Sequence, residues 1–202
     1  MSAETAGPLA ELAEVILEPK RVADIRELSW KAHKIETYTP RTMKESVDLM
    51  RMGKDQINAN PDGIDMGGAF LEAGIAVGML TPEGLLDEDS SSFKQGLEMY
   101  DTMLNNTQAY AVVTTPTNTR EDQLEAGRRW VRLNLTTTKN GLSLHPVSQA
   151  LQEYPEMAEL YEEVHKMLAP AGHTVQMLGR LGYGPTVAAS PRWPLEAKIV
   201  KS

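Results

Sequence analysis

The sequence predicts an α+β fold that is rich in helix and has a small sheet. Apolar residues recur every three or four positions along most of the 202-residue chain, which is the spacing of amphipathic helices. Only two short segments look like strands, and roughly 60 residues separate them. A chain of this length is enough for one domain with a sizeable core, or for two small ones.

Three helices are expected in the first part of the chain. The first covers residues 21–37, where the apolar stripe begins at Val22. A capping box from Thr42 to Glu45 is expected to start the second, and Gly53 to end it. The third, residues 66–80, contains four glycines, so it is expected to survive by packing closely against a neighbour. Its inner face would carry Phe70, Ala73, Val77 and Leu80.

The second half of the chain holds both expected strands. A capping box from Ser92 to Gln95 is expected to open one helix, and the β-branched run 110–115 forms the first strand. Thr119 is expected to cap a helix over 120–139, and alternating polarity predicts the second strand at 174–181. The residues expected on the inner face of the 120–139 helix are Leu124, Val131 and Leu135.

The number of strands is itself informative. Two strands alone form a marginal sheet in water, and a stable sheet needs more strands or an extensive helical cover. Either helices cover the pair completely, or strands come from another chain or a missing segment, or a strand of this chain escapes detection.

Composition and motifs exclude several classes of function. The net charge of −8 argues against a general nucleic-acid surface, and the absence of cysteine removes disulfide and thiolate chemistry. None of the four histidines lies in a zinc-binding motif, so no metal site is expected. No phosphate loop, nucleophile elbow, signal peptide or membrane-spanning run is present in the sequence as written.

Several separated segments carry a recognisable pattern. The main one runs from Ala126 to Met157 and includes Gly141-Leu-Ser-Leu-His-Pro-Val-Ser-Gln149. Supporting segments are Glu45–Gly53, Pro61–Ile64, Met177–Tyr183 and Pro191–Glu196. In this order, from about residue 20 to the end, they resemble the Acg-like, twin-arginine-signal branch of the nitroreductase superfamily. The resemblance implies a nitroreductase-like α+β fold with a small, mostly antiparallel sheet. It also implies FMN at a dimer interface or between two halves of a longer chain, NAD(P)H as reductant, and nitro compounds or quinones as small-molecule electron acceptors.

The resemblance also assigns candidate cofactor-binding residues. The loop of His145, Pro146, Val147, Ser148 and Gln149 would lie at the edge of the flavin ring, with Ser148 and Gln149 as donors to N5. Two of these positions have an alternative role, because Ser148 is also placed to cap the next helix and His145 to be a structural histidine.

At the other end of the chain, Arg192 would pair with the FMN phosphate, since a guanidinium fork suits a dianion. A surface ion pair is its alternative role. No residue is assigned a catalytic role.

The chain departs from the family's pattern in its N-terminal half. The twin-arginine signal and the flavin-contacting segment Ala-Pro-Ser-x-His-Asn-Thr-Gln-Pro-Trp are both lacking. The chain is therefore expected to be a C-terminal portion or a homo-oligomer that completes its site with another chain. We expect an N-terminal extension over residues 1–20 and a nitroreductase-like domain over 21–202, with a possible lid at 53–80. The location is cytoplasmic as written, and periplasmic if the parent protein carries the signal.

Three functions follow as alternatives. The first is an FMN-dependent oxidoreductase that transfers two electrons from NAD(P)H. The second is a protein that binds or sequesters FMN without turnover, with the 53–80 lid closing the site. The third is a helical interaction domain that has lost the flavin.

Overall fold

The computed structural model describes residues 9–185, 187 and 189–199. They form two compact units. Of the described residues, unit 1 contains 9–36 and 101–185, and unit 2 contains 37–100, 187 and 189–199. The boundaries predicted from the sequence, at residue 20 and around 53–80, stay predictions.

The centre of unit 1 is a four-stranded antiparallel sheet with strand order β1-β4-β6-β5. Its strands are β1 (Glu14–Ile16), β4 (Ala109–Thr115), β5 (Ser143–Pro146) and β6 (Thr174–Gly182). The two strands expected from the sequence are confirmed as the central pair, β4 and β6. The two missing strands come from this chain itself, so the count of two was wrong. Both are short edge strands, and β5 ends in a proline, which sheets tolerate only at an edge.

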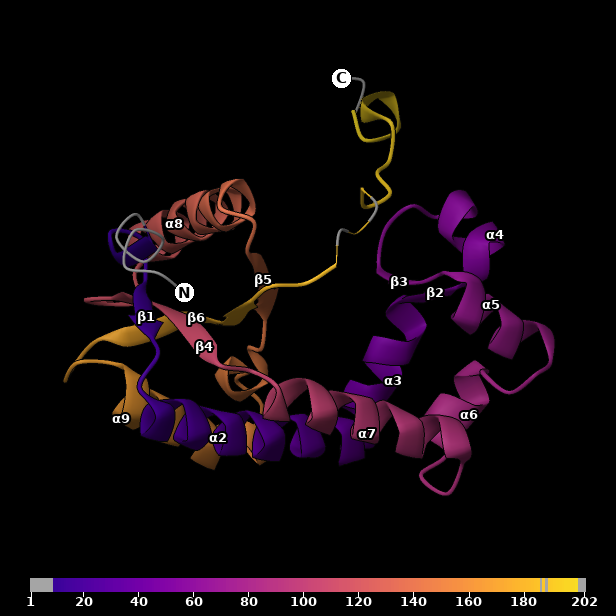
Figure 1. The fold of residues 1–202 in the computed structure, drawn as a ribbon, viewed down its shortest axis with the longest axis horizontal. Helices are drawn as coiled ribbons and strands as arrows, with labels where there is room; N and C mark the ends of the chain where they lie inside the picture. The colour runs from indigo at the N-terminus through magenta and orange to yellow at the C-terminus, as the bar shows by residue number, and fades with distance from the viewer. Residues whose placement is uncertain (1–8, 186, 188, 200–202) are drawn as a thin grey trace. The chain divides into compact units, whose positions relative to one another are not determined.

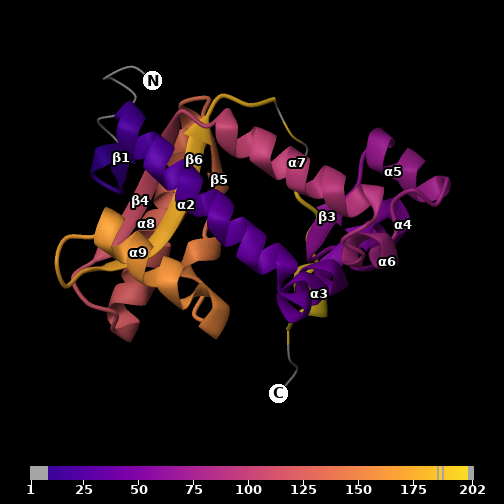
Figure 2. The same ribbon diagram turned by 90° about the horizontal axis from the view of Figure 1, so that it is seen from below.

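Helices cover both faces of this sheet (Figures 1 and 2). Helix α8 (Arg120–Lys139) lies on one face, and α2 (Pro19–Tyr38) and α9 (Ala158–Leu168) lie on the other. Because both faces are covered, β4 is apolar along most of its length, and Tyr110, Ala111 and Val113 have no exposed surface. Between β5 and α9 the chain forms two short 3₁₀ turns, η1 (Gln149–Leu151) and η2 (Pro155–Met157).

Helix α8 begins as the sequence predicts but faces the other way. The Thr119 hydroxyl accepts a hydrogen bond from the Asp122 N–H, and the Asp122 side chain bonds back to the Thr119 N–H, which completes a capping box. The residues predicted to face the core are wrong, because the buried ones are Ala126, Leu133 and Thr137. The predicted residues are 52%, 58% and 65% exposed, in the order Leu124, Val131 and Leu135.

A close contact holds α8 against β6. A Cβ on Gly179 of β6 would lie 2.7 Å from Cη2 of Trp130 and 2.9 Å from Cδ1 of Leu144. Only glycine therefore allows the indole and the neighbouring strand to approach this closely. The same core contains residues near the start of the described chain, because Leu9 and Ala13 belong to it and Leu12 and Val15 pack against it.

Unit 2 is built from short elements. They are α3 (Pro40–Leu49), β2 (Met50–Met52), α4 (Gly53–Ala59), β3 (Ile64–Met66), α5 (Ala69–Ala76), α6 (Pro82–Leu86), most of α7 (Ser91–Asn105) and η3 (Leu195–Ala197). Strands β2 and β3 pair in parallel. A small core of Val47, Met52 and Leu85 holds the unit together.

Three expectations for unit 2 are wrong. Helix α3 begins at Pro40 rather than at a Thr42 cap, and Thr42 Oγ1 instead donates to the Thr39 carbonyl. Gly53 begins α4 with a φ of +80° instead of ending a helix, because β2 intervenes. The cap of α7 is two residues earlier than expected, since the Ser90 hydroxyl, rather than that of Ser92, accepts from the N–H three residues on, at Phe93.

The glycine-rich helix is also shorter than predicted. Residues 64–66 form a strand, and the helix covers Ala69–Ala76 alone. The inward assignment is wrong for Phe70 and Val77, which are 85% and 70% exposed. It is confirmed for Leu80, which contacts the small core together with Ile75.

We expect Gly179→Ala to lower the free energy of unfolding by about 1–3 kcal/mol, because its Cβ would overlap the Trp130 ring in a closely packed site. Gly182→Ala is the matched control on the same strand, since a Cβ there meets nothing within 4 Å. When Trp130→Phe is also present, Gly179→Ala should lower the free energy of unfolding by less than it does in the wild-type protein. Urea unfolding of the wild type, Gly179→Ala, Trp130→Phe and the double variant measures this coupling. Strictly additive changes in the free energy of unfolding would contradict the contact.

Candidate functional site

The segment from His145 to Gln149 leaves the sheet of unit 1 at its edge. His145 is paired with Arg180 and Pro146 with Gly179 across β5 and β6. The Val147 N–H then donates to the Leu178 carbonyl at 3.0 Å, and the Val147 side chain is only 1% exposed. The sheet therefore holds the chain in register for one residue beyond β5, and the backbone turns away at Ser148.

Ser148 does not act as a helix cap. It stands before η1 with φ −100° and ψ 15°, and its side chain makes no capping hydrogen bond. Its carbonyl accepts from the Leu151 N–H at 2.9 Å, so the backbone conformation is set without the hydroxyl. The capping role considered for Ser148 is thus wrong. Both Ser148 and Gln149 are half-buried.

His145 forms a polar pair with Arg180 on the neighbouring strand. Arg180 Nε donates to His145 Nδ1 at 3.0 Å, which requires an unprotonated Nδ1. Partial burial of the imidazole, followed by the positive charge of Arg180, lowers the pKa of His145. The pair therefore presents a neutral imidazole and a fixed guanidinium beside the predicted loop.

Arg192 belongs to unit 2, so its geometry is that of unit 2 alone. It is exposed, and its Nη1 donates to the carbonyl of its neighbour Pro191 at 2.8 Å. Within the described residues it has no carboxylate partner, so the surface ion pair considered for it is not formed there. The guanidinium group of Arg192 is therefore available to bind an anion.

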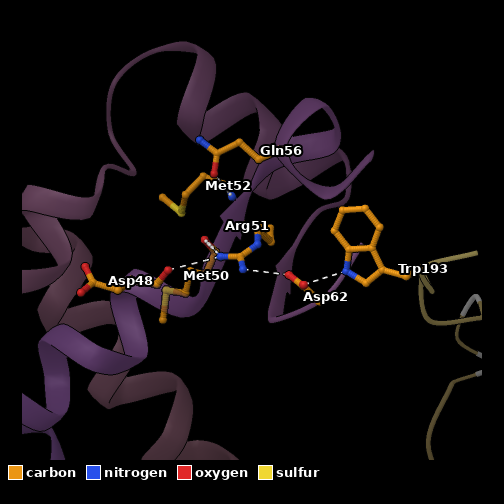
Figure 3. Close-up of polar contacts among 7 residues, drawn as sticks. All are labelled: Asp48, Met50, Arg51, Met52, Gln56, Asp62 and Trp193. Carbon is orange, nitrogen blue, oxygen red and sulfur yellow. Dashed lines mark hydrogen bonds and ion pairs between the residues drawn. The ribbon is translucent and has the colours of Figure 1, made fainter. Parts of the chain in front are cut away.

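The residue after Arg192 is held by a chain of polar contacts (Figure 3). Trp193 Nε1 donates to Asp62 Oδ2 at 2.7 Å, and Arg51 Nη2 lies 2.8 Å from Asp62 Oδ1. The indole hydrogen bond, and then the Arg51 guanidinium, lower the pKa of Asp62. Lys198 lies over the Trp193 ring, 4.5 Å from its centroid. These contacts attach the segment 191–198 to the turn before β3.

A cavity of about 1070 Å³ lies within unit 2 beside this attachment. Glycines at 63, 67 and 68 and the segment around Trp193 form its walls. Its charged lining combines three cations, Lys54, Arg192 and Lys198, with the carboxylates of Asp62, Asp65 and Glu72. The cavity therefore contains donors for an anionic group as well as acceptors for polar hydrogens.

Sequence reasoning missed two of these features. Pro61–Ile64 was assigned no role beyond the resemblance, although its Asp62 holds Trp193. Met177–Tyr183 was assigned only to a strand and to the resemblance, although its Arg180 contacts His145. Both contacts join residues that are far apart in the sequence. The one feature of the sequence that could have pointed to such a contact was Trp193, which directly follows Arg192.

Two kinds of site are absent from the part of the chain that the structure describes. No group of three or more histidine, aspartate or glutamate side chains is arranged to hold a metal ion there. No helix among the same residues is long and apolar enough to cross a membrane.

Comparison with known proteins identifies the fold. No protein-family model and no curated protein matches the chain. The FMN-dependent nitroreductase NfnB from Mycobacterium smegmatis, solved in complex with NADPH, is 18% identical, and the match covers 100% of this chain and 89% of that chain with a TM-score of 0.56. A nitroreductase with bound FMN from Bacteroides fragilis NCTC 9343 is 11% identical over 100% of this chain and 88% of that chain, with a TM-score of 0.46. The first likeness shows a nitroreductase-like α+β fold, as the sequence predicted.

We expect Asp62→Ala to shift the indole N–H resonance of Trp193, because the mutation removes its acceptor. In the wild type this contact should persist at neutral pH and be lost only as the pH falls through the lowered pKa of Asp62. Asp65→Ala is the control, since Asp65 lines the same cavity but accepts from the Gly67 N–H. ¹H–¹⁵N spectra across a pH series measure this. An unmoved Trp193 resonance in Asp62→Ala would contradict the contact.

We expect His145 to titrate below its ordinary value of 6.5. Arg180→Gln should raise the pKa of His145, because a positive neighbour is lost, but the pKa should stay below the ordinary value because burial remains. The ring resonances of the four histidines, followed by NMR against pH, give the midpoint, with Arg120→Gln as the control. A midpoint that Arg180→Gln lowers or leaves unchanged would contradict the pairing.

Proposed function

We propose that this chain is an FMN-dependent oxidoreductase of nitroreductase type. The observation that carries the proposal is its nitroreductase-like fold over the whole chain, which it shares with a protein described as FMN-dependent and solved with NADPH. Because one fold hosts many functions, the proposal also needs residues suited to a flavin. Two groups of residues meet this need.

The first group is the turn after β5. A flavin ring edge needs main-chain or side-chain donors held at fixed positions, since charge and a proton arrive near N5 on reduction. The bond from Val147 to Leu178 fixes the backbone just before Ser148, and the Ser148 hydroxyl is not consumed by capping. The predicted donors Ser148 and Gln149 are therefore compatible with a flavin contact, with His145 and Pro146 leading into it.

The second group surrounds Arg192. A phosphate dianion is bound well by a guanidinium fork that is not already paired with a carboxylate, and among the described residues Arg192 donates only to the Pro191 carbonyl, although Asp62, Asp65 and Glu72 line the same cavity. The attachment of Trp193 to Asp62 restricts the backbone next to Arg192, and Lys54 and Lys198 add positive charge to the same cavity. These residues fit the phosphate end of FMN.

The reaction follows from the cofactor. FMN, when bound, supplies two-electron transfer from NAD(P)H to a small acceptor such as a nitro compound or a quinone. The chain's own contribution is to bind and orient the ring and to hold a fixed positive charge near it. His145, being neutral, can donate through Nε2 while Nδ1 accepts from Arg180.

The proposal includes a homo-oligomer and membership of the Acg-like, twin-arginine-signal branch, with export where a parent protein carries that signal. The order of the segments from Ala126 to Glu196 supports the branch.

The function is tested by titrating purified protein with FMN, recording its absorbance spectrum, and then adding NADPH without oxygen. We expect a perturbed flavin spectrum that bleaches with NADPH and recovers when a nitro compound or quinone is added. A bound flavin that NADPH leaves oxidised would indicate the sequestering alternative. No binding at high micromolar FMN would contradict flavin chemistry in this chain and favour an interaction domain.

We expect Arg192→Gln to raise the dissociation constant for FMN by about tenfold or more, because a charge-assisted bond to the phosphate is lost. Ser148→Ala should weaken FMN binding without changing the urea midpoint, because the hydroxyl makes no cap. Lys94→Gln, an exposed change on α7, is the control for lost charge. If riboflavin, which has no phosphate, responded to Arg192→Gln as strongly as FMN does, the assignment of Arg192 would be wrong.

A further inference from the structure

Glu36 places a carboxylate on the buried side of α2. That side carries residues three or four positions apart, each at most 4% exposed: Val22, Ile25, Ser29 and Ala32. Glu36 follows Ala32 by one helical turn, so it continues the same side, and its side chain is only 17% exposed. Carboxylates are rarely buried to this extent unless a partner holds them, so the position calls for a specific contact.

The contact is made by Gln152, which lies 116 residues further along the chain. Gln152 Nε2 donates to Glu36 Oε1 at 2.8 Å, within unit 1. The other polar atom of this amide, Oε1, is buried and accepts no hydrogen bond from the described residues. Glu36 therefore accepts the one hydrogen bond described for the Gln152 side chain. Without it a buried amide would have no partner, which is costly enough to drive the side chain out of its place.

The neighbouring histidine does not act as a charged partner of Glu36. His33 Nδ1 lies 4.0 Å from Glu36 Oε2, and the Trp30 ring stacks on the imidazole with the ring centroids 6.0 Å apart. Burial lowers the pKa of His33 to about 4, so the imidazole is neutral at neutral pH. An ion pair with His33 therefore does not explain the buried carboxylate, and the neutral donor that faces it is Gln152.

Gln152 closes the turn that contains the candidate flavin donors. Its backbone N–H donates to the Gln149 carbonyl at 3.1 Å, and the Leu151 N–H donates to the Ser148 carbonyl at 2.9 Å. These two bonds make residues 148–152 one short 3₁₀ turn, so its end and its beginning move together. Displacing Gln152 therefore displaces the backbone of Ser148 and Gln149.

The turn needs a second anchor, because its first one holds only the upstream end. There the Val147 N–H bonds to the Leu178 carbonyl of β6. Within the turn Ala150 is 2% exposed, but an apolar contact is non-directional. A 3₁₀ turn of this length has poor hydrogen-bond geometry, so it is not rigid by itself. The bond from Gln152 to Glu36 is directional and ties the downstream end to a 20-residue helix.

We propose that Glu36 is a positioning residue for the candidate flavin loop. It holds Gln152, and through it sets the backbone of Ser148 and Gln149 before a flavin arrives. A loop whose bound conformation is already set loses less conformational freedom on binding, so the contact raises affinity without touching the flavin. The identity of the ligand rests on the proposed function, whereas the hold of Glu36 on the turn does not.

The first experiment measures amide hydrogen exchange in the full chain without flavin, by ¹H–¹⁵N NMR. In Glu36→Ala the amides of Leu151 and Gln152 should exchange about tenfold faster than in the wild type, because the turn loses its downstream anchor. The Val147 amide should be unchanged, since its bond to β6 remains. Wild-type exchange of Leu151 and Gln152 in Glu36→Ala would overturn the proposal.

Two further variants separate the hydrogen bond from other effects. Glu36→Gln should exchange as the wild type does, because its amide oxygen still accepts from Gln152. Glu27→Ala is the matched control and should also leave the turn unchanged. Glu27 lies on the same helix, its side chain is 68% exposed, and it pairs with Lys31 rather than with the turn. A Glu36→Gln protein that exchanges as fast as Glu36→Ala would overturn the role of the hydrogen bond.

The second experiment titrates the same variants with FMN and follows the flavin absorbance. We expect Glu36→Ala to raise the dissociation constant for FMN by about tenfold, while Glu36→Gln and Glu27→Ala bind as the wild type does. Circular dichroism checks that each variant is folded. Unchanged FMN affinity in Glu36→Ala would overturn the positioning role. If the wild type itself bound no FMN, the proposed function would fail, and the exchange experiment would still decide whether Glu36 fixes the turn.

Discussion

The structure of unit 1 depends on the antiparallel pairing of β4 with β6. These strands come from segments about 60 residues apart, and their pairing runs from Ala109 with Leu181 to Thr115 with Thr174. A pair of this kind is stable only when apolar layers cover it, and α8 supplies one layer while α2 and α9 supply the other. The edge strands β1 and β5 are held only because this pair offers them hydrogen-bonding partners on its outer sides.

Strand β6 also sets the position of the candidate flavin loop. Three consecutive residues do this in different ways: the Leu178 carbonyl accepts from Val147, Gly179 leaves room for Trp130, and Arg180 donates to His145. The segment from His145 to Gln149 therefore inherits its geometry from the central sheet, although it is itself an edge strand followed by a turn. In unit 2 a comparable role falls to Asp62, which joins Arg51 to Trp193 beside Arg192.

The elements that the sequence predicts correctly are those with strong local signals. Helix α2, the Thr119 cap of α8, and strands β4 and β6 are of this kind. Strands β1 and β5 carry no such signal, because three or four residues at a sheet edge need neither alternation nor β-branched side chains. The inner face of α8 was assigned wrongly for another reason, since an exposed leucine at helical spacing looks the same in sequence as one that faces the core. For the candidate site, the resemblance led to the prediction of His145–Gln149 and Arg192, which stays a prediction, and gave no sign of the long-range contacts that hold their neighbours.

The central claim is that FMN contacts the turn after β5 in unit 1 and, separately, the segment around Arg192 in unit 2. Hydrogen exchange of the protein with and without saturating FMN tests it most directly. We predict that FMN slows exchange in peptides covering residues 145–151 and 189–195, while β4 and β6 exchange slowly in both states. Protection confined to other segments, or no change in these two peptides at saturation, would contradict the account.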